Sequence, residues 1–313
     1  MAPQADDGFS QFDELLGGTD TATSPWVDGR FVPDLDLLKV MLSMPISQGD
    51  KQETGRTAKA FDAWVAHELR RAGFPEDGVW PRLRRPRVLA SGLGSLERKL
   101  DNLTEQLRDV ESDGAAQLKP RQLRNAVRAL ENHSLGTSSA YILGDFYKKQ
   151  IDVGLSSWQH GPDILISTKS MFSAYGKNLK NRHEEAVGEV ASLRRRHPMA
   201  AMGYAYLVRQ DILQQPSAYN TLYDILSRLR RPGETFDATM LLVVDWDDDA
   251  PELGLRLLDQ PAPDLTASRF FADIVNCVIH RSPSKVHEDV RLRHGGLPVG
   301  GIDPEEDPEF DDA

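Results

Sequence analysis

The chain has 313 residues, of which 40% are hydrophobic and 27% are charged, and its formal net charge is −11. This length and composition are typical of a globular protein of one large or two small domains. There is no apolar run of about 18 residues and no basic-then-apolar leader, so we expect a cytoplasmic protein without membrane insertion or export. The single cysteine, Cys277, excludes an internal disulfide and a cysteine-rich zinc site, and it fits a reducing compartment.

The acidic residues gather at the two ends of the chain. Residues 1–20 contain five acidic residues, residues 302–313 contain seven, and neither segment has a lysine or arginine. We therefore predict that residues 1–30 and the acidic tail at residues 301–313 are disordered. The remainder is close to neutral, and clustered bases there could bind a polyanion, although solvated helix ends explain such clusters as well. The clusters are Arg82–Arg87, Lys177–Arg182, Arg194–Arg196 and Arg228–Arg231.

Residues 31–79 are predicted to form a helical N-terminal part of the core. Within this part, residues 55–73 carry apolar side chains at helical spacing and predict a strong amphipathic helix. Two acidic residues, Asp62 and Glu68, lie on this helix. Each is either a surface acid or a residue that reaches towards a functional site.

Residues 80–135 are predicted to be a helical insertion or accessory lobe. Its clearest feature is a short heptad seam, Leu96–Val110, in which leucines recur at spacings of four and three. The seam is too short for an independent coiled coil, so we expect it to pack on the body or on a partner. A further helix is predicted within residues 136–159, because apolar side chains cluster around Tyr141 and Phe146.

Residues 136–300 are predicted to form the α/β core. Residues 161–171, Gly-Pro-Asp-Ile-Leu-Ile-Ser-Thr-Lys-Ser-Met, are β-rich and follow a turn signal, which indicates a buried strand. Because side chains alternate along a strand, Asp163, Ser167 and Lys169 are expected on one face. A lysine that closes a buried strand either reaches back to water or projects into a functional cleft.

The elements after this strand alternate in type. A helix–strand–helix–strand–helix order argues for a mixed sheet with flanking helices. The strands are continuous apolar runs, as expected for strands covered on both faces. In chain order we predict a loop at residues 170–179, a helix at 181–196, a strand at 199–207, a helix at 218–229, a strand at 238–246 and a helix at 267–280.

Pro162-Asp163, followed by Ser167-Thr168-Lys169 on a strand and then by a helix, resembles the PD-(D/E)xK nuclease superfamily, the fold of many type II restriction endonucleases. The resemblance implies a restriction-endonuclease-like α/β fold, here with a helical insertion, in which a mixed central sheet is flanked by helices. It also implies that Asp163 binds Mg²⁺ and that Lys169 orients or deprotonates the attacking water. Carboxylates with Mg²⁺ supply the charge neutralisation that phosphodiester hydrolysis needs.

The chain departs from the family pattern in two ways. Ser167 stands where the pattern has an acid, and some members with a serine there take the second carboxylate from the following helix. Glu184, Glu185 and Glu189 are the candidates, with Glu185 or Glu184 the better spaced.

The second departure is that Asp163 and Lys169 are six positions apart, which is roughly 20 Å on a straight strand. Either the chain bends after Asp163, which we favour, or another acid such as Asp152 or Asp145 is the first metal ligand. The resemblance also suggests that an acid of the first helix, best Asp62, reaches the metal.

We therefore expect a Mg²⁺-dependent endonuclease that hydrolyses double-stranded DNA, in a bacterial restriction or phage-defence system. Palindromic DNA would match a homodimer. The residues expected to contact DNA are Lys177, Asn178, Arg182 and Arg194, most of them in or beside the loop after the strand.

Two alternatives remain. One is a catalytically inactive nucleic-acid-binding or regulatory protein on the same fold, with Ser167 marking the lost activity. The other is a helical adaptor that recruits a partner through the seam Leu96–Val110. The usual motifs of P-loop enzymes, dinucleotide oxidoreductases, zinc proteases and esterases are absent from the sequence.

Overall fold

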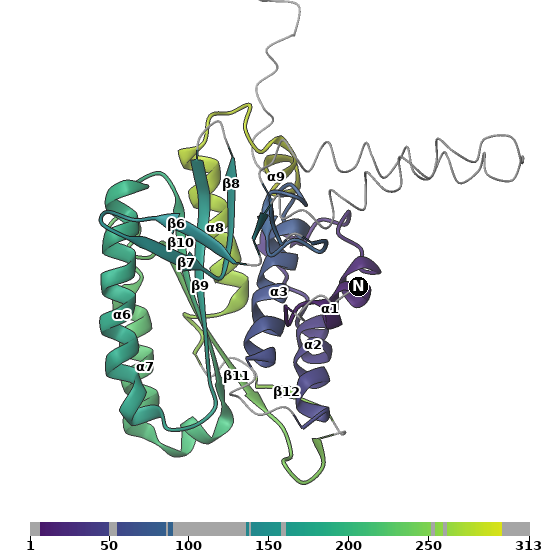
Figure 1. Ribbon diagram of the computed structural model, residues 1–313, viewed down its shortest axis with the longest axis vertical. Coiled ribbons are helices and arrows are strands. Elements are labelled where there is room, and N and C mark those ends of the chain that lie inside the picture. The colour runs from purple at the N-terminus through teal and green to yellow at the C-terminus, as the bar shows by residue number, and fades with distance from the viewer. Residues whose placement is uncertain are drawn as a thin grey trace, which may run out of the picture.

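A mixed six-stranded sheet forms the centre of the protein (Figure 1). The computed structural model describes residues 7–49, 55–85, 87–89, 136–137, 139–157, 161–251, 254–258 and 262–295. The three long central strands run parallel to one another, and the shorter strands at both sides are antiparallel to their neighbours. In sheet order the strands are β12 (Arg256–Leu257), β11 (Ala238–Asp245), β10 (Ala201–Arg209), β9 (Gly161–Met171), β8 (Val153–Ser157) and β3 (Val79–Trp80).

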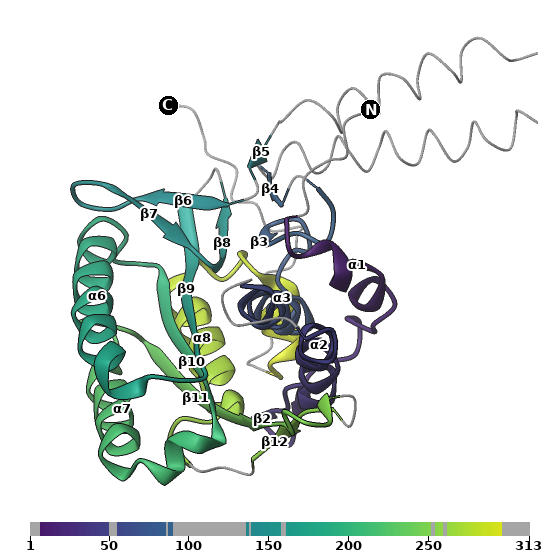
Figure 2. The ribbon, with the colours of Figure 1, turned by 60° about the horizontal axis from the view of Figure 1, so that its bottom comes forward.

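Helices cover both faces of this sheet (Figures 1 and 2). One face packs against α6 (Tyr175–Arg196) and α7 (Pro216–Leu229). The helices on the opposite face are α1 (Ser10–Gly17), α2 (Leu35–Ser47), α3 (Arg56–Arg71), α8 (Ala267–Arg281) and α9 (Glu288–Arg293). Each face thus has its own apolar core, which is why the central strands are apolar on both sides. The prediction of a mixed α/β protein is confirmed.

Strand β9 divides its side chains between the two cores. Ile164 and Ile166 lie in the core that contains α3, whereas Leu165 lies in the core that contains α6. By the same alternation Ser167 and Lys169 share the α6 face, and Thr168 faces α3. This division places the polar end of β9 between two helices that both carry acidic residues.

The predicted helix within residues 136–159 is wrong. These residues form β6 (Ala140–Leu143), β7 (Lys148–Ile151) and β8, and β6 pairs antiparallel with β7 as a hairpin. Burial alternates along β6, with Ala140 buried and Tyr141 exposed, which is the period of a strand and not of a helix. Gly144 and Asp145 supply the turn between the two strands.

The N-terminal segment is also ordered from residue 7 onwards, contrary to the prediction of disorder for residues 1–30. It contains α1 and a small hairpin of β1 (Trp26–Val27) and β2 (Arg30–Phe31). Phe9, Phe12 and Leu16 are buried in the α3 core, and this apolar burial holds the segment in place. Residues 1–6 lie outside the described residues.

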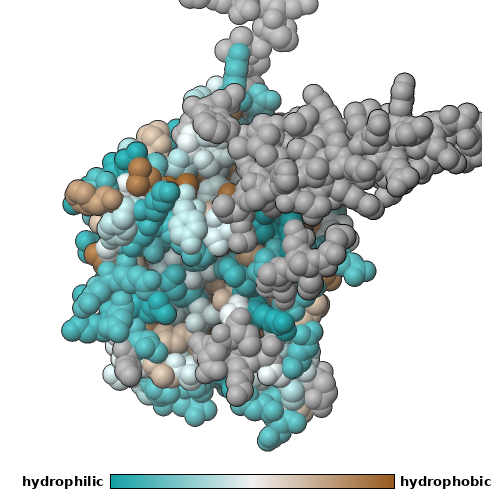
Figure 3. Space-filling model, in the orientation of Figure 1, coloured by the Kyte–Doolittle hydropathy of each residue, from teal (hydrophilic) through white to brown (hydrophobic). Residues whose placement is uncertain are grey.

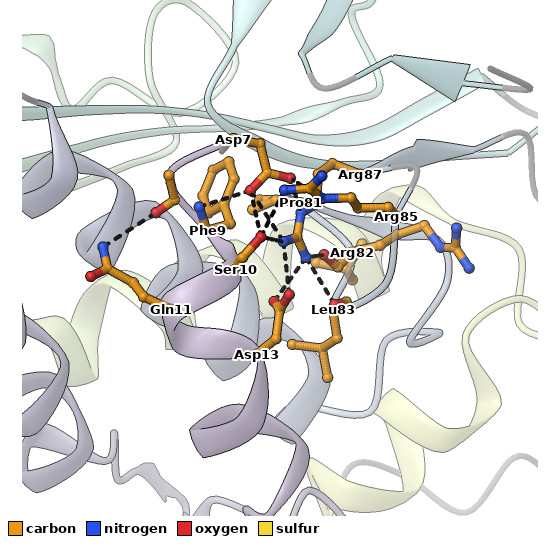
Figure 4. A network of polar contacts seen from close by, with 12 residues as sticks. Asp7, Phe9, Ser10, Gln11, Asp13, Pro81, Arg82, Leu83, Arg85 and Arg87 are labelled. Atoms are coloured by element: carbon orange, nitrogen blue, oxygen red, sulfur yellow. Dashed lines mark hydrogen bonds and ion pairs between the residues drawn. The ribbon is translucent and has the colours of Figure 1, made fainter. Parts of the chain in front are cut away.

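A buried arginine ties this segment to the body (Figure 4). Arg87 is 1% exposed and binds Asp7 Oδ2 at 2.8 Å and Asp13 Oδ1 at 2.8 Å. Burial alone would raise the pKa of Asp7, but the hydrogen bond and charge of Arg87 lower it to about 2. Arg82 is buried as well and pairs with Asp77 at 3.0 Å. At least these two arginines of the cluster Arg82–Arg87 are therefore structural and are not available to a polyanion.

Most of the predicted insertion at residues 80–135 lies outside the described residues, as do the seam Leu96–Val110 and the acidic tail 301–313. Strand β4 (Val88–Leu89) pairs antiparallel with β5 (Gly136–Thr137), so residues 89 and 136 lie side by side. None of the helices in the described part of the chain has the length and apolar character needed to span a bilayer.

Candidate active site

The polar end of β9 forms the base of the candidate site. Lys169 Nζ donates a hydrogen bond to Ser167 Oγ at 2.9 Å and lies 3.6 Å from Asp152 Oδ2. Ser167 is 3% exposed, whereas the Lys169 side chain is 19% exposed and can reach solvent. Ser167 therefore fixes the direction of an amine that remains accessible.

Asp152 reaches this end of β9 because of the pairing between β8 and β9. The antiparallel ladder begins at Val153 opposite Ile166, so β9 continues beyond the start of β8. Asp152 precedes Val153, and its Oδ2 accepts a hydrogen bond from the Thr168 amide at 2.9 Å and one from Ser167 Oγ at 3.3 Å. Beyond the last paired residue of β8, the Asp152 carboxylate therefore accepts the hydrogen bond from the β9 backbone, and it lies beside Lys169.

Helix α6 contributes Glu189 to the same place. Glu189 is 7% exposed. Burial raises its pKa and the charge of Asp152 raises it further, whereas Lys169, Lys149 and a hydrogen bond with Ser167 lower it. The raised pKa shows that nearby cations do not fully compensate this carboxylate.

Helix α3 contributes Asp62 from the other side of β9. Thr168 Oγ1 donates a short hydrogen bond to Asp62 Oδ1, and Lys59 Nζ lies 3.4 Å from Asp62 Oδ2. Burial, followed by the charge of Asp152, raises the pKa of Asp62 to about 6. The negative charge of Asp152 therefore disfavours ionisation of Asp62 across β9.

We call Asp62, Asp152, Lys169 and Glu189 the carboxylate–lysine cluster. No three Asp, Glu, His or Cys side chains in the described ranges converge into a ready-made metal site. Mg²⁺, however, is commonly held by one or two carboxylates together with water and substrate phosphate. A divalent cation would favour ionisation of Glu189, whose pKa is raised in part by the charge of Asp152, so these two carboxylates fit Mg²⁺.

The predicted grouping of Asp163 with Lys169 is wrong. Strand β9 runs from Gly161 to Met171, and although Asp163 is the extra residue of a bulge opposite Leu155 and Ser156, this irregularity does not bring it to the Lys169 end of the strand. Asp163 lies at the opposite end of the strand, 3.7 Å from His287 Nε2 at the start of α9. The alternative that the sequence left open, Asp152, is the acid that contacts Lys169.

The choice of glutamate on α6 is corrected in the same way. Glu184 and Glu185 are largely exposed, and they pair with Lys180 at 4.0 Å and Arg182 at 2.6 Å respectively. The glutamate that points inwards is Glu189, one turn after Glu185. Helical rotation therefore selects a residue that sequence spacing had ranked below Glu184 and Glu185.

The four residues predicted to contact DNA differ in burial and in the partners they contact. Arg194 is buried and pairs with Asp237 at 2.8 Å, so it stabilises the fold and the prediction for it is wrong. Arg182 pairs with Glu185 on the surface. Asn178 donates to the Ala174 carbonyl at 3.2 Å. It lies on α6, which begins at Tyr175, and not in a loop as predicted. The side chain of Lys177 lies outside the described residues.

An open pocket of about 660 Å³ lies between α6 and α7, lined among others by Leu179, Lys180 and Thr221. No member of the carboxylate–lysine cluster lines it. We therefore treat the cluster as the candidate site and the pocket as a separate feature.

Comparisons of the chain with protein-family models, with curated proteins and with solved structures find no match. The geometry of the carboxylate–lysine cluster is therefore the basis on which a function can be assigned.

Proposed function

We propose that this protein is a Mg²⁺-dependent endonuclease that hydrolyses phosphodiester bonds of double-stranded DNA. The observation that carries the proposal is the contact of the Lys169 amine with Asp152 and Ser167 at the open edge of β9, beside Glu189. An accessible lysine amine beside two carboxylates is an arrangement that phosphoryl transfer uses.

Each residue of the cluster has a role in this proposal. Asp152 and Glu189 would hold Mg²⁺, which when bound neutralises phosphate charge and makes water a better nucleophile. Lys169 would orient the attacking water and stabilise the charge that develops on the phosphoryl oxygens. Ser167 aims the Lys169 amine, since its Oγ accepts the hydrogen bond from Nζ.

The arrangement of elements supports the finer fold proposal, a restriction-endonuclease-like core. An acid from α3, a lysine on the central strand β9 and an acid from α6 lie around the same end of β9, Asp62 on one face of the strand and the other two on the opposite face. We include in the proposal a bacterial restriction or phage-defence role in the cytoplasm, and a homodimer if the target sequence is palindromic.

The test is cleavage of plasmid and linear duplex DNA by purified protein with Mg²⁺ and with EDTA. Lys169→Met and Asp152→Asn should each lower the cleavage rate about 100-fold or more. Lys285→Met removes an exposed lysine outside the cluster and should cut at the wild-type rate. If Lys169→Met cuts as fast as the wild type, Lys169 is not catalytic and the proposal fails.

A second candidate function is a nucleic-acid-binding or regulatory protein on the same fold without catalysis. Ser167 in the place of an acid favours it, because β9 itself then offers no carboxylate beside Lys169. Calorimetric titration with Mg²⁺ separates the two candidates. A nuclease should bind the ion at a site that Asp152→Asn removes, whereas binding of DNA without ion binding or cleavage would favour the second candidate.

A further inference from the structure

The hairpin formed by β6 and β7 leads directly into the candidate site. Its strands pair from Ala140 opposite Ile151 to Leu143 opposite Lys148, and the Gly144 amide bonds the Tyr147 carbonyl at 2.9 Å to close the turn. Asp152 follows β7 immediately. Figures 1 and 2 show the hairpin extending across the sheet towards α6.

The hairpin exposes large apolar side chains at and near its tip. Phe146 at the tip is 81% exposed, Tyr141 is 57%, Tyr147 is 53% and Leu143 is 41%. In Figure 3 the tip of the hairpin, at the upper left, carries brown atoms above a mostly teal surface. Aromatic side chains gathered on one exposed element indicate a contact surface and not ordinary surface composition.

Polar contacts to the end of α6 hold this tip in place. The Asp145 amide donates to Ser192 Oγ at 3.0 Å, and Arg195 Nη1 donates to Asp145 Oδ2 at 3.0 Å. A Cβ at position 144 would overlap Ser192 Oγ, so Gly144 is needed for this close approach. The tip is therefore fixed in position while its side chains remain exposed, so it is preorganised for binding.

The charge of the hairpin identifies the kind of partner. Lys148 is exposed at the start of β7, and Lys149 Nζ lies 4.8 Å from the centre of the Tyr147 ring. The charge of Lys149 also acts on Glu185 and Glu189 of α6, so the basic side of the hairpin lies near the candidate site. Cations interleaved with aromatic rings complement a polymer of phosphates and stacked bases.

We propose that this hairpin is a DNA-contacting element, in which Phe146 stacks against or between base pairs of a duplex and Lys148 binds a backbone phosphate. The inference rests on the proposed function for the identity of the polymer. A two-stranded ribbon fits a groove of duplex DNA, and apolar side chains are known to wedge between base steps. Phe146 in the turn and Asp152 just after β7 are six positions apart, so at most about 20 Å separates them along the chain. At about 3.4 Å per base-pair step, Phe146 would lie within about six base pairs of the scissile bond.

The first experiment measures binding of a labelled 30-base-pair duplex by full-length protein in EDTA. Phe146→Ala should weaken binding about 10-fold, in the range found for loss of one base–aromatic stack. Leu292→Ala removes another exposed apolar side chain, on α9, and should bind as the wild type does. Lys148→Gln should lower the slope of log affinity against log salt by about one.

The second experiment detects stacking directly. The fluorescent base 2-aminopurine, placed at successive positions of a duplex that contains the cleavage site, should change its emission at a position within about six base pairs of that site, and Phe146→Ala should abolish the change. Unchanged affinity together with no position-specific signal would overturn the inference. Tighter binding of single-stranded DNA or of membrane vesicles than of the duplex would overturn it too.

The two proposals fail in different ways. If the wild type cuts DNA and Phe146→Ala binds and cuts equally well, the hairpin inference fails and the proposed function stands. If the wild type binds the duplex through Phe146 but never cuts with Mg²⁺, the proposed function fails and the hairpin inference stands.

Discussion

Replacement of Asp62 by asparagine tests the electrostatics of the candidate site without relying on activity. The pKa of this carboxyl rises from 3.8 to about 6 through burial and the charge of Asp152. Each pKa unit corresponds to about 1.4 kcal/mol, so ionised Asp62 destabilises the folded state by about 3 kcal/mol. Asparagine has nearly the same shape, and its Oδ1 can still accept the hydrogen bond from Thr168.

Proton binding by Asp62 determines whether stability rises or falls with pH. The folded state holds the Asp62 proton more tightly than the unfolded state, so the wild type loses stability as the pH rises from about 4 through about 6. Asp62→Asn has no proton to lose at this position. Its stability relative to the wild type should therefore grow with pH, by about 1 kcal/mol between pH 5 and pH 8 and by about 3 kcal/mol over the full range.

The assay is urea unfolding of both proteins in EDTA at several pH values, with the difference in the free energy of unfolding plotted against pH. Asp224→Asn, on the exposed surface of α7, controls for the loss of one negative charge. The reasoning is refuted if the difference between Asp62→Asn and the wild type stays constant or shrinks as the pH rises.

Three further outcomes are expected. Glu189→Gln should lower the rate of plasmid cleavage about 100-fold, whereas Glu185→Gln should stay within a few-fold of the wild type; the reverse order would reinstate Glu185 as the ligand. Arg194→Met should lower the free energy of unfolding by about 3 kcal/mol in urea, because it leaves Asp237 with less compensation, while duplex affinity is unchanged; a selective loss of DNA binding would contradict its structural role. Phe12→Ala should cost about 3 kcal/mol in the same unfolding assay, and a cost near zero would show that the N-terminal segment does not belong to the core.

Several elements could be predicted because their signals are local. The helix expected at residues 55–73 is α3, and the apolar runs after β9 are β10 and β11. Hydrophobic periodicity over about ten residues is enough to identify such elements. The hairpin of β6 and β7 was missed because its strands have only four residues each, too few to distinguish a strand from a helix by pattern.

The sequence by itself determined that Ser167 and Lys169 share one face of a buried strand, since alternation is a property of any strand. Only the tertiary structure decided which acids meet the Lys169 amine. Asp152 arrives through the antiparallel return of β8, and its hydrogen bond to Thr168 joins residues 16 positions apart. Glu189 arrives through the rotation of α6 against the sheet. Strand register and helix rotation are set by packing between distant segments, so no local pattern could rank Asp152 above Asp163 or Glu189 above Glu185.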